Sequence, residues 1–183
     1  MKLVVAVTGA SGAIYAKRLL QVLKEKNVEV HLIISDQAKI IAKTELNELF
    51  NYNEFAEKIY DSKDLTAPLS SGSFKIDGMV IIPASMKTIG AIASGFSENL
   101  ITRAADVQLK ERRILIIVPR ETPLNTIHLR NMAKLSSLGA IILPAMPAFY
   151  HKPENIEELV DFVVGKILDQ LGLEHSLYRR WGD

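Results

Sequence analysis

Three things are scarce in this chain of 183 residues: cysteine, net charge and long apolar segments. It has no cysteine, which excludes disulfides, thiolate nucleophiles and cysteine-based metal sites. Its 22 Lys and Arg nearly balance its 21 Asp and Glu, so neither nucleic acid nor an anionic membrane is the expected partner. No segment reaches the roughly 18 apolar residues that a membrane-spanning helix needs. The apolar start of the chain is also too short for the core of a signal peptide. These absences predict a single globular domain of the cytoplasm.

Metal catalysis has little support. The four histidines are scattered along the chain, and there is no HExxH, DDxxD or clustered set of carboxylates. We therefore expect no metal site.

Apolar runs alternate with amphipathic segments along the chain. Runs typical of buried parallel strands lie at 2–8, 28–35, 78–84, 114–119 and 140–145. Helical spacing of apolar residues is found at 12–26, at 36–46 with Asp36 as the expected N-cap, and around 86–94, 98–110, 125–137 and 155–171. This alternation predicts an α/β fold, a three-layer doubly wound parallel sheet. The weakly patterned segment 50–76 is expected to be a mobile surface loop.

Ligands of doubly wound sheets bind at the carboxyl ends of the strands, so the turns that follow each strand are the candidate site. "TGASGA" (8–13) offers two flexible glycines, the Ser11 hydroxyl and a helix N-terminus that favours a phosphate. The alternative is a tight turn without a ligand, because the spacing matches neither GxGxxG nor a P-loop. Ser35 ends the second strand, where the ribose or ribityl part of a cofactor often lies, or it simply caps the next helix. With no acid at that strand tip, an FMN-type monophosphate is at least as well supported as NAD.

"PASMKT" (83–88) is a second candidate anion site. Ser85 can cap the following helix, and the freed amides together with Lys87 can bind an anion. A capped helix with an exposed lysine explains the pattern equally well. Arg103 and Lys110, seven residues apart on one helix face, indicate a solvated basic face, and Lys166 in the last helix indicates a solvated lysine.

Charges also follow the strand at 114–119. In "VPRETPLN" (118–125), Arg120 can bind a phosphate bidentately, and Glu121 can orient it or move protons. The alternative is a weak surface ion pair, but the position at the ligand-binding edge favours function.

"PAMPAFYHKP" (144–153) follows the last strand as a stiff proline-rich segment. Tyr150 can donate a hydrogen bond to an anion, whereas His151 is expected to be a surface histidine. Trp181, the only tryptophan, lies in a tail (172–183) expected to dock on a neighbouring chain.

The motifs TGASGA, PASMKT, PRETPL, AMPAFY and GKILDQLG, in this order over the whole chain, resemble the UbiX-like flavin prenyltransferases. The resemblance implies a Rossmann-like, flavodoxin-like flavoprotein domain over 1–183, assembled as a homododecamer. It implies transfer of the dimethylallyl group of dimethylallyl phosphate to N5 and C6 of reduced FMN. The product, prenylated FMN, would serve a UbiD-type decarboxylase of ubiquinone or aromatic acid metabolism.

The resemblance also implies roles for particular residues. Those expected to hold FMN are Gly9, Ala10, Ser11, Ser35, Ser85, Met86, Lys87, Thr88 and Arg103. Those expected around the allylic phosphate are Lys110, Arg120, Glu121, Tyr150, Lys166 and Trp181, some of them from a neighbouring subunit. Those expected to take part in catalysis are Ser11, Glu45, Arg120 and Glu121. At Lys166 the family often has arginine, and lysine keeps the charge without the bidentate fork.

Cleavage of an allylic C–O bond leaves extra negative charge on the phosphate. Arg120, Lys110, Lys166 and the Tyr150 hydroxyl could offset this charge where other prenyltransferases use magnesium, and Glu121 or the released phosphate could assist proton transfer. Three alternatives are an FMN-dependent cysteine-peptide or phosphopantothenoylcysteine decarboxylase, direct decarboxylation of hydroxybenzoates, and a flavodoxin-like FMN carrier. The first family uses a catalytic histidine and an asparagine-containing motif, and a carrier would need no basic phosphate cluster.

Overall fold

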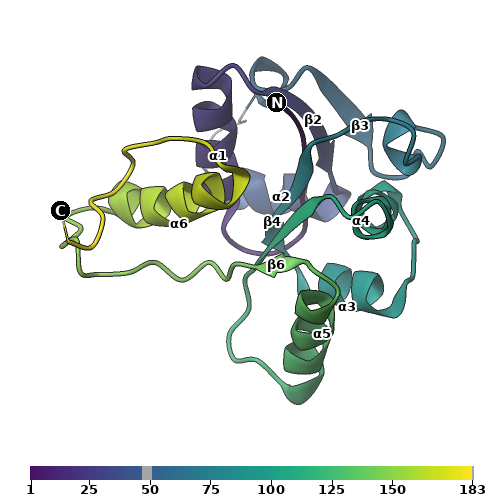
Figure 1. The fold of residues 1–183 in the computed structure, drawn as a ribbon. Helices are drawn as coiled ribbons and strands as arrows, with labels where there is room; N and C mark the ends of the chain where they lie inside the picture. Colours follow the sequence, from purple (N-terminus) through teal and green to yellow (C-terminus); the bar gives the residue numbers. More distant parts are fainter. Residues whose placement is uncertain (47–50, 183) are drawn as a thin grey trace.

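The computed structural model describes residues 1–46 and 51–182. Within them, the strands form one parallel sheet in the order β3-β2-β1-β4-β5-β6. The strands are β1 (Lys2–Val7), β2 (Glu29–Ile34), β3 (Lys58–Asp61), β4 (Gly78–Ala84), β5 (Ile114–Pro119) and β6 (Ile141–Ile142). The helices are α1 (Ala13–Glu25), α2 (Asp36–Glu45), α3 (Met86–Ser94), α4 (Leu100–Lys110), α5 (Thr126–Ser137) and α6 (Ile156–Leu171), with short 3-10 helices η1 (Tyr52–Glu54) and η2 (Pro68–Ser70). The predicted doubly wound α/β fold is confirmed (Figure 1).

The sheet is buried on both faces, which gives three layers. Alternate residues of β1 point to opposite sides: Val5 packs in a core with α1 and α6, and Val4 packs in a core with α3, α4 and α5. Figure 1 shows these two sets of helices on opposite sides of the sheet. None of the helices within the described residues is long and apolar enough to span a membrane.

The structure corrects the prediction for segment 50–76, of which residue 50 lies outside the described residues. Residues 58–61 form β3, which pairs with β2 at the edge of the sheet. Tyr60, Leu69 and Ile76 are buried, with 6%, 2% and 5% of their surfaces exposed. The segment is therefore packed structure; its apolar residues are too widely spaced to show a strand or helix pattern.

Two boundaries also differ from those predicted. Ser35, and not Asp36, caps α2, because its Oγ accepts the Ala38 amide at 3.2 Å. β6 is shorter than the predicted 140–145, although the Leu143 and Ala145 amides still donate to carbonyls of β5. The chain thus follows β5 to the same sheet edge as the other strands.

A buried histidine joins the edge strand β3 to β2. His31, 5% exposed, lies 2.8 Å through Nδ1 from the Tyr60 hydroxyl and 3.0 Å through Nε2 from Glu29. Burial raises the pKa of Tyr60, so its hydroxyl stays neutral near pH 7. Both ring nitrogens of the histidine are satisfied by this chain of contacts.

We predict that Tyr60→Phe lowers the free energy of unfolding by about 1–3 kcal/mol, because a buried ring nitrogen of His31 loses its partner. Urea denaturation of both proteins at one fixed protein concentration measures the difference. An unchanged midpoint and slope would show that the hydroxyl contributes nothing to the attachment of β3.

Candidate functional site

A cavity of about 200 Å³ lies at the carboxyl ends of β1, β2 and β4. The residues of these strand ends that line it are Thr8, Gly9, Ser35, Ser85, Lys87 and Thr88. All but Thr8 were predicted as cofactor-binding residues. Three turns that are far apart in the sequence therefore meet where the sheet topology predicted.

Thr8 ties two of these turns together. Its hydroxyl donates to the Pro83 carbonyl at 2.7 Å and accepts the Ser85 amide at 2.8 Å. The residue is 2% exposed, so both bonds are shielded from water. Thr8 was not predicted as a site residue, and the only signal for it in the sequence is a hydroxyl at the end of an apolar strand.

The N-terminus of α3 faces this cavity as an open anion site. Ser85 Oγ accepts the Thr88 amide at 3.3 Å and lies 3.0 Å from the Thr88 hydroxyl. The amides of Met86 and Lys87 make no hydrogen bond among the described residues, as expected in a first helical turn. These amides, the helix dipole and the nearby Lys87 ammonium favour a bound phosphate. Lys87 is itself exposed and pairs with Glu98 at 3.4 Å.

The N-terminus of α1 is already occupied. The Glu45 carboxylate, at the end of α2, accepts the Gly12 amide at 2.9 Å and the Ala13 amide at 2.8 Å. Gly12 enters the helix with φ 113°, a left-handed conformation that favours glycine. A side chain of the protein thus fills the place where the sequence suggested a phosphate, so the geometry does not favour a phosphate at this turn.

Two other predicted catalytic residues, Ser11 and Arg120, act on Glu45. Burial alone would raise the pKa of Glu45, but hydrogen bonds from Ser11, Ala13 and Gly12 and the charge of Arg120 outweigh it and lower the pKa. Ser11 and Arg120 thus act on the same carboxylate. The Arg120 amide donates to the Ala84 carbonyl at 3.3 Å, which sets the end of β5 beside the end of β4.

Glu121 is exposed beside Arg120. Its carboxylate accepts the Thr122 amide at 3.1 Å, which fixes the side chain at the turn. Ser11, Glu45 and Arg120 therefore interact within a single chain, and Glu121 follows Arg120 in the turn after β5.

Two glycine-turn residues have packing roles. A β-carbon at Gly9 would lie 2.6 Å from Cβ of Gln37, so glycine is needed for the close approach of this turn to α2. Ala10 is 8% exposed, and Met86 is half-buried against the core beneath α3.

Other predicted residues lie away from the cavity. On α4, Arg103 donates to the Ser70 carbonyl at 3.1 Å and pairs with Asp106 at 2.7 Å, while Lys110 pairs with Glu111. Neither basic residue lines the cavity at the strand ends.

Tyr150, Lys166 and Trp181 form a third group beside α6. The Tyr150 and Trp181 rings are 5.3 Å apart, and Lys166 pairs with Asp169 at 3.4 Å. Figure 1 shows the chain after β6 running away from the sheet toward the C-terminal end. One chain therefore places the predicted donor-binding residues in separate groups.

His151 is not the surface histidine that was predicted. Its ring stacks on Phe162 at 5.5 Å with an interplanar angle of 6°. Both ring nitrogens are buried and have no hydrogen-bond partner among the described residues. Phe162 of α6, which covers the ring, is too distant in sequence to have indicated this burial.

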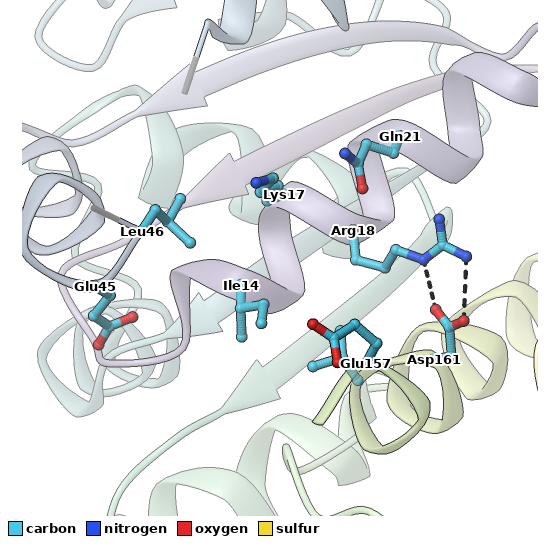
Figure 2. Close-up of a pocket in the computed structure, with 9 residues that line it drawn as sticks. Ile14, Lys17, Arg18, Gln21, Glu45, Leu46, Glu157 and Asp161 are labelled. Carbon is cyan, nitrogen blue, oxygen red and sulfur yellow. Dashed lines mark hydrogen bonds and ion pairs between the residues drawn. The ribbon is translucent and has the colours of Figure 1, made fainter. Parts of the chain in front are cut away.

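A larger cavity of about 560 Å³ lies on the outer side of Glu45, between α1 and α6 (Figure 2). Arg18 and Asp161 cross it as an ion pair of 2.6 Å. Of the predicted site residues, only Glu45 lines it, so size alone does not identify the functional cavity. Across residues 1–46 and 51–182, no cluster of three or more histidine or acidic side chains is placed to hold a metal ion.

We predict a pH-dependent stability effect for Glu45→Gln. Because the folded state lowers the pKa of Glu45 below its ordinary value of 4.5, its contribution is present above that pH and is lost as the pH falls through the lowered value. The variant should be less stable than the parent at about pH 7, and the difference should shrink toward about pH 3. Urea denaturation across this range measures it; a difference independent of pH would contradict the role of the charged carboxylate.

Comparison with known proteins shows which proteins the chain is similar to. A family model described as Flavoprotein matches residues 1–168. The flavin prenyltransferase UbiX of Methanocaldococcus jannaschii is 56% identical over 183 residues, which is 100% of this chain and 99% of that protein.

Solved structures show the same fold over the whole chain. A dodecameric FMN-dependent UbiX-like decarboxylase from Escherichia coli O157:H7 has a TM-score of 0.97 and 48% identity, covering 100% of both chains. AnUbiX (PadA1), solved with FMN and dimethylallyl pyrophosphate, has a TM-score of 0.97 and 47% identity, covering 100% of this chain and 97% of that one. The peptidyl-cysteine decarboxylase EpiD shares the fold alone, with a TM-score of 0.62 and 24% identity over 80% of this chain and 81% of that one. These full-length matches lead to one conclusion: the chain belongs to the UbiX family of flavin prenyltransferases.

Proposed function

We propose that this protein joins the dimethylallyl group of dimethylallyl phosphate to N5 and C6 of reduced FMN without a metal ion. The observation that carries the proposal is the pairing, at one strand edge, of an open phosphate site on α3 with the Ser11–Glu45–Arg120 group. Reduced FMN, when bound, supplies N5 and C6 as nucleophiles. The chain's own residues bind the two phosphates, orient the reacting groups and move protons.

The cofactor phosphate is assigned to the N-terminus of α3. One cavity is lined by Ser35 at the end of β2 and by Ser85, Lys87 and Thr88 at the start of α3. The unbonded amides of Met86 and Lys87 belong to the same first turn of α3. Hydroxyls and amides with a helix dipole make a phosphate site without requiring a basic residue in direct contact. Gly9, Ala10 and Ser11 then border the flavin. In a single chain the Arg103 guanidinium binds the Ser70 carbonyl and the Asp106 carboxylate. Its contact with FMN therefore stays a prediction.

The second phosphate, that of the donor, needs positive charge as the allylic bond breaks. Arg120 lies at the strand edge and can offset the negative charge of the phosphate. Lys110, Lys166 and the Tyr150 hydroxyl are the further residues predicted to do so. Because one chain holds these residues in separate groups, we propose that a homo-oligomer, a dodecamer as in the Escherichia coli neighbour, brings them together. Glu121 or the released phosphate would move the proton. The proposed recipient of the product is a UbiD-type decarboxylase, and the proposed location is the cytoplasm.

The direct test is anaerobic incubation of the protein with FMN, dithionite and dimethylallyl phosphate, followed by mass spectrometry of the extracted flavin. We expect the flavin to gain one C5H8 unit. Unmodified FMN recovered from protein shown to bind it would refute prenyl transfer and would favour cysteine-peptide decarboxylation or electron transfer.

We predict that Glu121→Gln slows this reaction while leaving FMN binding unchanged, because the amide cannot accept the proton. Loss of a general base typically costs about 10²–10⁴-fold in rate. Single-turnover formation of prenylated FMN measures the effect. Product formation at the parental rate would remove Glu121 from proton transfer and leave that role to the released phosphate.

Thr8→Val should weaken FMN binding about tenfold or more. The variant keeps the shape of Thr8 but leaves the Ser85 amide without its partner. The Pro83 carbonyl keeps only the backbone amide of residue 8, at 3.3 Å, so the turn before α3 is loosened. Flavin fluorescence titration gives the dissociation constant. Thr44→Val is the matched control, because the Thr44 hydroxyl donates to the Ile40 carbonyl on the exposed side of α2 and makes no other hydrogen bond within residues 1–46 and 51–182. Equal FMN affinities of the two variants would contradict the proposed role of Thr8.

A further inference from the structure

The C-terminal tail, residues 172–182, folds back onto α6 of its own chain. Gly165 makes this contact possible, because a β-carbon there would lie 2.6 Å from the Tyr178 ring and 2.7 Å from the His175 ring. The two rings therefore lie directly on the helix backbone. The close packing of these rings on α6 therefore determines the position of the tail.

Asp169, one turn beyond Gly165, holds the tail by its carboxylate. It accepts the Tyr178 hydroxyl at 2.7 Å and pairs with Arg180 Nη2 at 2.8 Å. His175 lies 3.1 Å away through Nε2, and its Nδ1 accepts the Leu177 amide at 3.2 Å, so Nε2 carries the proton and donates to Asp169. Three residues of the tail thus converge on one side chain.

Asp169 is charged and Tyr178 is neutral near pH 7. Burial alone would raise the pKa of Asp169, but hydrogen bonds from Arg180, Tyr178 and His175 outweigh it and hold the pKa well below its usual range. Burial and the bond to Asp169 raise the pKa of Tyr178 to about 12, so its hydroxyl remains a donor. The tail is therefore held by a permanent anion, as charge-assisted hydrogen bonds require.

The docked tail creates a cavity of about 430 Å³ with a distinct composition. It is lined by Tyr150, His151, Lys152, Arg179, Arg180 and Trp181, together with Gly182. Among the described residues, the lining has cations and aromatic rings and no carboxylate, which suits a small anion that carries an apolar group. Tyr150 and Trp181, 5.3 Å apart and nearly perpendicular, are held together here only if the tail stays in place.

We propose that Asp169 is a positioning residue for the allylic donor: by anchoring the tail to α6, it sets Arg180 and Trp181 beside Tyr150 so that they bind dimethylallyl phosphate as one surface. The proposal rests on the proposed function and names a residue and a cavity that complete its donor site. Asp169 does not touch the donor and acts through the tail.

The direction in which Asp169→Asn changes the affinity for dimethylallyl phosphate distinguishes a positioning role from a purely electrostatic one. Removing the carboxylate adds net positive charge beside Lys166 and Arg180, which by itself would strengthen the binding of a phosphate. Loss of positioning would weaken it. A weaker affinity in Asp169→Asn therefore cannot come from the change in charge.

The experiment compares the full-length protein with Asp169→Asn, Gly165→Ala and the control Asp161→Asn, which removes an acid of the same helix that pairs with Arg18 away from the tail. Each protein is loaded with oxidised FMN, so that donor affinity is measured by calorimetry without turnover. Trp181, the only tryptophan, reports the order of the tail through its fluorescence anisotropy.

We expect both tail variants to lower the anisotropy and to weaken dimethylallyl phosphate binding about tenfold, with FMN affinity unchanged. Gly165→Ala keeps the carboxylate and decides the question if Asp169→Asn does not fold. Donor affinity equal to that of Asp161→Asn, or a loosened tail with unchanged donor affinity, would overturn the proposal. A parent protein that binds the donor but forms no prenylated FMN would instead refute the proposed function and leave the positioning role standing.

Discussion

The contact of the Glu45 carboxylate with the first amides of α1 determines how the whole strand edge is used. Two helices, α1 and α3, present their N-termini there, and each is a potential anion site. Because Glu45 fills the first, the second is left for an external phosphate. The same contact places a charged carboxylate beside Ser11 and Arg120, where bond-making chemistry can use it. A single long-range interaction therefore makes the N-termini of α1 and α3 different: the first is filled by a side chain and the second is open.

The hydroxyl of Thr8 holds the turn after β1 and the turn after β4 in a fixed relative position. It is bonded to both the carbonyl and the amide that flank Ala84, so the glycine turn after β1 and the capped turn after β4 move as one unit. Both bonds are buried, and a buried amide that lost its partner would cost far more than an exposed one. The central strands thus supply a rigid frame, and the more exposed ends of β5 and the tail add the charged groups.

The parts that sequence predicted well are those with local causes. The five apolar runs became strands and the turn residue Ser85 became a helix cap, because strand burial and capping depend on neighbours in sequence. Local patterns failed where the cause is distant. The edge strand β3 depends on a buried His31–Tyr60 contact across the sheet, and the burial of His151 depends on Phe162. The anchoring of the tail by Asp169 was likewise missed, since an acid three residues after Lys166 indicates only a helical ion pair.

The central claim is that Glu45 occupies the N-terminus of α1, whereas the FMN phosphate binds at that of α3. A crystal structure of the protein with FMN bound tests it most directly. The phosphate should lie at the N-terminus of α3, within hydrogen-bond distance of the Met86 and Lys87 amides and the Ser85 and Thr88 hydroxyls. Glu45 should still accept the Gly12 and Ala13 amides. A phosphate seated on those α1 amides, with Glu45 displaced, would contradict the division of the site described here.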